Sequence, residues 1–197
     1  MGFGFVFVGY LLCLNTVLPV YTMPVTALVA ALGLRKLRVW NAAFKRAFAI
    51  GFAVAALGVA AAVVRNLPVP DTLIAVLFSA LWLSVCLWQF FLFSGIYSLA
   101  SEVGLPRLRA RALFAEVIAT FYWFLYAFLE LDTGETLAPI VARFLLPMIV
   151  VGLVVAIVGL VVLFNCYTDI GMPDEKDKPE KPGLFSRLNR KNGGKQS

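Results

Sequence analysis

The chain has 197 residues, of which 61% are hydrophobic and only 14% are charged, and its mean hydropathy is +0.90. About a quarter of the residues of soluble domains are charged, so the composition excludes a soluble globular protein and predicts an all-α, multi-pass membrane helical bundle. The chain contains no histidine, which excludes histidine metal sites and Ser–His catalytic pairs. The formal charge is +6, but its placement in loops favours a membrane surface as the partner, and we expect neither nucleic acid, nor metal, nor cofactor.

The first apolar block, residues 3–34, carries no charged side chain and exceeds the roughly 20 residues that cross a bilayer. It contains Pro19 and Pro24. Proline lacks the amide donor and clashes with the carbonyl four residues earlier. We therefore expect one helix kinked at these prolines, or a short crossing followed by an interfacial stretch.

Asn15 lies near the centre of the same block. One interpretation is an interhelical hydrogen bond that locks a bent helix against its neighbours. The other is a ligand site where the amide and unwound backbone converge, as in transporters with discontinuous helices.

The segment of about 34–46 separates apolar and basic residues onto two arcs at about 100° per residue. This pattern predicts an amphipathic helix on the membrane surface, between the first two transmembrane helices, with its cations toward anionic headgroups. A docking helix for a cytoplasmic partner is the alternative. The expected membrane-surface contacts are Arg35, Arg38, Trp40, Lys45 and Arg46.

Four further blocks predict transmembrane helices at about 47–64, 72–99, 112–130 and 137–164, which gives about five crossings in all. The second helix of the chain has small residues at four-residue spacing, Ala47, Gly51 and Ala55. Small residues at this period allow helix backbones to approach closely. This helix is therefore expected at the centre of the bundle or at an interface.

Two polar side chains inside the later blocks are candidate ligand-binding residues together with Asn15. Gln89, among aromatic residues, is expected to make an interhelical hydrogen bond or to contact a ligand. Glu116 is an ionisable residue inside a predicted span, which marks it for either a structural ion pair or a proton or substrate role.

The lysines and arginines gather in alternate loops, around 35–46 and 107–111, and in the tail after residue 171. Basic residues near membrane ends stay in the cytoplasm, so five crossings place the N-terminus outside and the C-terminus inside. Residues 1–170 are expected to form the membrane domain, and 171–197 a disordered basic cytoplasmic tail. Short loops without glycosylation sequons favour a bacterial inner membrane.

The sequence carries no nucleophile with a matching base, no Gly-rich phosphate loop and no metal-ligand motif, so an enzyme is not expected. The sequence favours a non-catalytic subunit or scaffold of a membrane assembly, with another membrane protein or a second copy as its partner. The alternative is a small-solute carrier, or the membrane-embedded binding component of a transporter, that uses Asn15, Gln89 and Glu116.

Overall fold

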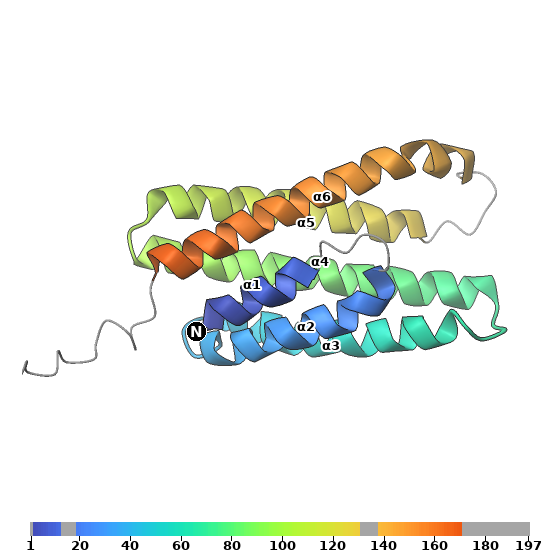
Figure 1. Cartoon of the computed structure of the whole chain (residues 1–197), viewed down its shortest axis with the longest axis horizontal. Helices are drawn as coiled ribbons and strands as arrows, with labels where there is room; N and C mark the ends of the chain where they lie inside the picture. The colour runs from blue at the N-terminus through green and yellow to red at the C-terminus, as the bar shows by residue number, and fades with distance from the viewer. Residues whose placement is uncertain (1, 13–18, 131–137, 171–197) are drawn as a thin grey trace, which may run out of the picture.

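The computed structural model describes residues 2–12, 19–130 and 138–170, and these residues form an elongated bundle of six α-helices (Figure 1). The prediction of an all-α membrane bundle is confirmed. The helices are α1 (Gly2–Leu12), α2 (Pro19–Leu37), α3 (Ala42–Val64), α4 (Asp71–Glu102), α5 (Pro106–Glu130) and α6 (Ala138–Asp169).

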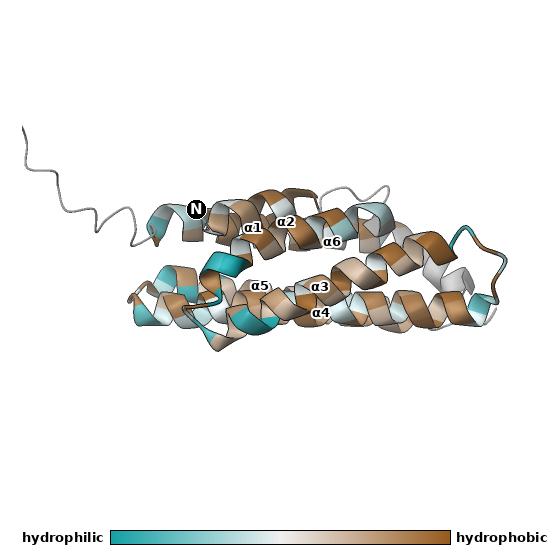
Figure 2. Ribbon diagram, turned by 90° about the horizontal axis from the view of Figure 1, so that it is seen from below, coloured by the Kyte–Doolittle hydropathy of each residue, from teal (hydrophilic) through white to brown (hydrophobic). Residues whose placement is uncertain are grey.

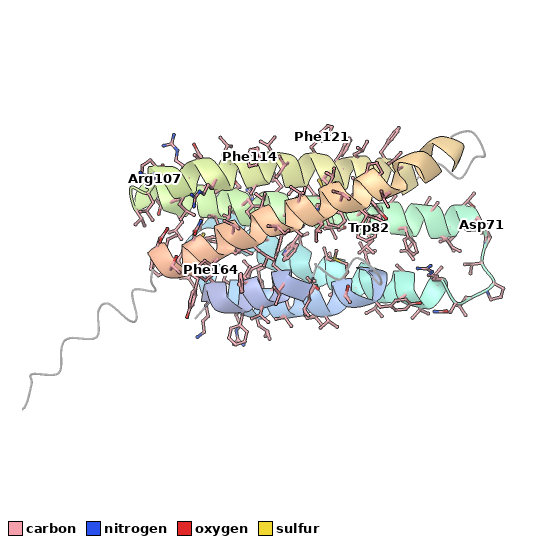
Figure 3. The ribbon with its side chains drawn as sticks, turned by 45° about the horizontal axis from the view of Figure 1, so that its top comes forward. Asp71, Trp82, Arg107, Phe114, Phe121 and Phe164 are labelled. Carbon is pink, nitrogen blue, oxygen red and sulfur yellow. The ribbon has the colours of Figure 1, made fainter. Side chains whose placement is uncertain are left out.

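Four helices in the described part of the chain are long and apolar enough to cross a membrane. They are α3, α4, α5 over Pro106–Leu129, and α6 over Leu146–Asp169. Hydrophobic residues cover the length of the bundle, and hydrophilic residues gather toward its ends (Figure 2). Phe114 and Phe121 point outward from α5 between Arg107 at one end of the molecule and Asp71 at the other (Figure 3). Such outward apolar side chains are what a bilayer requires.

Close packing holds α3 between α2 and α4, as its small residues predict. Gly51 and Gly58 are buried on α3. A Cβ at Gly58 would lie 2.8 Å from the ring of Pro24 on α2, and one at Gly51 would lie 3.5 Å from Nε1 of Trp88 on α4. The expected interface role of these small residues is therefore confirmed.

Helices α4 and α5 are antiparallel neighbours joined by side-chain hydrogen bonds to backbone. The Ser79 hydroxyl donates to the Ala127 carbonyl at 2.9 Å, and the Cys86 thiol donates to the Thr120 carbonyl at 3.4 Å. Because α4 also packs against α3, it is the central helix of the bundle.

The first apolar block differs from the prediction. Helices α1 and α2 run antiparallel: Gly9 faces Ala30, and Gly33 faces the Gly2 carbonyl. A single kinked helix over 3–34 is therefore wrong. Glycine lets the two backbones touch, and Pro19 stands at the first position of α2, where its missing amide donor costs nothing.

The predicted surface helix over about 34–46 is also wrong as a separate element. Helix α2 continues to Leu37, and α3 begins at Ala42 after a short turn. The turn ends because Asn41 caps α3, its side-chain oxygen accepting from the Ala43 amide at 2.9 Å. The basic amphipathic pattern is therefore divided between the ends of two helices.

The later helices extend past their predicted bounds, because the charged residues used to delimit the blocks continue the helices. Thus α4 reaches Glu102, α5 begins at Pro106 and α6 continues to Asp169. Gly104, at a φ of 75°, makes the tight turn between α4 and α5.

One end of the bundle, here named the basic end, gathers most of the described cations. They are Arg35, Lys36, Arg38, Lys45, Arg46, Arg107, Arg109 and Arg111. Gly2 lies at this end beside Gly33, and α6 reaches it too, because Tyr167 lies beside Gly4. The described residues Gly2 and Tyr167 thus lie at the same end of the bundle, whereas five crossings would put the two ends of the chain on opposite sides. The number of crossings and their orientation in a membrane stay predictions.

Candidate functional site beside the end of helix α1

Helix α1 is the short helix of the bundle. Its 11 residues measure about 16 Å, whereas the 32 residues of α4 measure about 48 Å. It starts at the basic end and reaches only part of the way along α4 (Figure 1). Its last turn carries the polar side chain of Tyr10.

Tyr10, in the last turn of α1, makes the central polar contact. Its hydroxyl donates to Oε1 of Gln89 at 3.0 Å, and each of the two side chains is only 1% exposed. The Tyr10 ring stacks on Trp88 with centroids 6.4 Å apart and meets Phe93 edge-on at 6.1 Å. Gln89 lies near the middle of α4, so this contact is deep in the bundle.

Helix α6 completes the contact through a glycine. A Cβ at Gly159 would lie 2.5 Å from the Tyr10 hydroxyl, so only glycine leaves room for the tyrosine. Tyr10, Gln89 and Gly159 therefore bring α1, α4 and α6 together. We name these three residues, with Thr26 and Trp88, the central layer.

Two polar atoms of the central layer have no hydrogen-bond partner among the residues that the structure describes. They are the hydroxyl of Thr26 and Nε1 of Trp88, and both side chains are 1% exposed. Leaving a buried donor unsatisfied costs about 1–3 kcal/mol, and such groups are uncommon in native structures. The layer thus has hydrogen-bonding capacity that the described residues do not use.

A second group of rings, the aromatic cluster, lies between α4 and α5. Trp82 and Trp123 stack at 5.2 Å with an interplanar angle of 16°, and Tyr126 meets Trp82 edge-on at 5.1 Å. The indole N–H groups of both tryptophans are buried, and within the described ranges neither has a hydrogen-bond partner. Tyr122 joins the cluster and reaches α6, where its hydroxyl donates to the Met148 carbonyl at 3.3 Å.

The outcome differs among the three predicted ligand-binding residues. Gln89 makes the interhelical hydrogen bond that the sequence predicted, with Tyr10 as its partner. Asn15 lies outside the described residues. Glu116 is half-buried on α5, and within the described part of the chain it makes no hydrogen bond or ion pair. The structure thus joins Gln89 to Tyr10 and does not link it to Glu116 by any such bond.

The predicted membrane-surface residues are exposed at the basic end. Arg38 lies 5.1 Å from the centroid of the Phe48 ring, and Arg46 lies 5.5 Å from that of Phe91. Arg35, Lys45 and Trp40 are also exposed. Cations stacked on rings keep their charge toward solvent while their stems cover apolar surface.

Sequence reasoning missed Tyr10, Thr26 and Gly159. Tyr10 carried a weak signal, since a buried tyrosine hydroxyl usually needs a partner. Nothing in the sequence pairs it with Gln89, 79 residues away. Gly159 is one of several glycines in apolar blocks, and its role depends on which helix packs against it.

Among the described residues, no group of three or more cysteine, aspartate and glutamate side chains lies close enough to hold a metal ion. Comparisons with protein-family models, curated proteins and solved structures find no match for this chain. The functional argument therefore rests on the central layer and on the basic end.

Proposed function

We propose that this protein is the membrane-embedded binding component for a small solute, as a carrier or as part of a transporter. The observation that supports it is the buried Tyr10–Gln89 hydrogen bond, which lies deep in the bundle in a layer where Thr26 and Trp88 have unused hydrogen-bonding groups. In transporters, substrate sites lie near the bilayer midplane.

The chemistry of the central layer favours a neutral solute that both donates and accepts hydrogen bonds. The amide oxygen of Gln89 is an acceptor that a solute donor could also use. The indole N–H of Trp88 and the hydroxyl of Thr26 supply unused donors. The side chains of the layer are uncharged, which is unfavourable for an ion of either sign.

We propose in addition that the basic end faces the cytoplasm, because lysine and arginine are retained there. The antiparallel contacts put Gly2 and Asp169 at that end, so both ends of the described chain would be cytoplasmic. A basic surface on the cytoplasmic side would bind an acidic partner or an anionic membrane surface.

A non-catalytic subunit of a membrane assembly is the second candidate. The exposed cations at the basic end, two of them held on the rings of Phe48 and Phe91, support it. Such a face is suited to electrostatic docking of a partner. The two candidates are compatible if the binding component operates inside an assembly.

The test is purification from the native host in mild detergent, followed by extraction and mass spectrometry of co-purifying small molecules. An enriched solute is then added back during thermal unfolding. At one hundred times its Kd, a ligand adds about 2.7 kcal/mol of stability, or about 5–10 °C for a domain of this size.

Two variants test whether the solute binds at the central layer. Gln89→Leu removes the amide with little change in volume and is expected to abolish the thermal shift. Ser84→Ala is the control on the same helix and should keep the shift. In the described part of the chain, Ser84 bonds only to the Ala80 carbonyl of its own helix, at 2.8 Å. Absence of any enriched solute, together with a stoichiometric protein partner, would favour the subunit instead.

A further inference from the structure

An apolar groove runs between α1 and α6 near the basic end. It has a volume of about 440 Å³ and is lined by Gly4, Phe5, Phe7, Val8, Phe164 and Tyr167. Space is left at Gly4, because within 4 Å a Cβ there would meet only the Tyr167 ring, at 3.7 Å. Phe7 and Phe164 close one stretch of it, with ring centroids 6.2 Å apart. Phe164 lies on the part of α6 near the basic end (Figure 3).

The groove is open toward the outside of the bundle. Phe5 is 47% exposed, Val8 50%, Phe164 52% and Tyr167 56%. In a membrane these rings and methyl groups meet hydrocarbon. A volume of this size falls within the range of about 300–1,000 Å³ that is typical of small-ligand sites.

The cations at the basic end outnumber the exposed carboxylates Glu102 and Asp169 there, so the charge of this end would select among lipids. Arg35 and Lys36 are exposed in the last turn of α2, just after Gly33, which lies against the first turn of α1. Cations at a membrane surface attract anionic headgroups, and Tyr167 at the rim has the amphipathic ring common at the interface. We propose that the groove binds one acyl chain of an anionic phospholipid whose headgroup lies at the basic end.

The lipid would act on the central layer through α1. One face of α1 borders the groove at Phe7 and Val8, and the next turn carries Tyr10. A chain seated between α1 and α6 adds contacts to both helices and resists their separation. Lipid binding is therefore expected to stabilise the Tyr10–Gln89 contact.

The experiment is native mass spectrometry of the full chain in detergent, titrated separately with dioleoyl phosphatidylglycerol and dioleoyl phosphatidylcholine. The wild type is expected to retain one phosphatidylglycerol, more tightly than phosphatidylcholine. Gly4→Leu fills the groove and should weaken retention by roughly tenfold, since several methylene contacts are lost. Ala56→Leu, on the exposed face of α3, is the matched control and should retain the lipid.

A second variant keeps the test valid if Gly4→Leu does not fold. Val8→Trp adds bulk from the exposed side of the groove and should give the same loss. Joint replacement of Arg35 and Lys36 by glutamine should remove the preference for phosphatidylglycerol. Equal retention of both lipids by the wild type, unchanged retention by Gly4→Leu and Val8→Trp, or a protein dimer in place of a lipid adduct would overturn the proposal.

Discussion

The hydrogen bond between Tyr10 and Gln89 gives the sharpest test of the central layer. Tyr10→Phe removes the hydroxyl and keeps the ring, so the packing on Trp88 and Phe93 is retained. The Gln89 oxygen then loses its donor at a site where both side chains are 1% exposed. Loss of such a partner costs about 1–3 kcal/mol, while measured interhelical bonds in a membrane protein average about 0.6 and reach about 1.7 kcal/mol.

We therefore expect Tyr10→Phe to lower the free energy of unfolding by about 1–2 kcal/mol. Combined with Gln89→Leu, it should show a coupling of about 1 kcal/mol. The assay is reversible unfolding of the two single variants and the double variant in mixed micelles of fixed composition. Because independent sites add to within about 0.3–0.5 kcal/mol, an additive double variant would show that the bond contributes nothing, and the structural basis of the central layer would fail.

Three further outcomes are expected. Gly9→Ala should destabilise the protein by about 1–3 kcal/mol, since its Cβ would lie 2.7 Å from the Ala30 backbone nitrogen. Its control, Gly4→Ala, should be neutral or stabilising by up to about 1 kcal/mol. Equal chemical-denaturation midpoints for the two variants would contradict the packing of α1 on α2. If both ends of the chain are cytoplasmic, fluorescent-protein fusions to either end should be bright and alkaline phosphatase fusions to either end inactive. One bright and one dark fluorescent fusion would instead support the topology with the two ends on opposite sides. Arg46→Gln should cost about 0.5–1 kcal/mol through lost contact with the Phe91 ring, and the same loss in a variant that already carries Phe91→Leu would show that the ring is not the partner.

The prediction from sequence succeeded where one local property decides the structure. Long uncharged stretches must be helical in lipid, so the bundle and its later helices could be located from the placement of charge alone. The spacing of Ala47, Gly51 and Ala55 identified a packing face, because close approach depends on side-chain size and period.

Prediction from the sequence failed where the structure depends on which helices pack against each other. With no charge between residues 3 and 34, charge placement could not divide this block into α1 and α2. The reversal between them depends on Gly9 and Gly33 facing Ala30 and Gly2. Gln89 was correctly expected to bond across helices, but its partner lies 79 residues earlier.

The position of α1 has a consequence for how the protein is made. Helix α1 can pack on α2 as soon as both are made, but its polar contact lies on α4, and Gly159 of α6 accommodates the Tyr10 ring. Gln89 is synthesised 79 residues after Tyr10, a delay of about 4–16 s at 5–20 residues per second. During this interval the tyrosine hydroxyl must rely on lipid headgroups, water or an insertion factor. Helix α1 is therefore expected to complete its packing only after the later helices of the bundle are made.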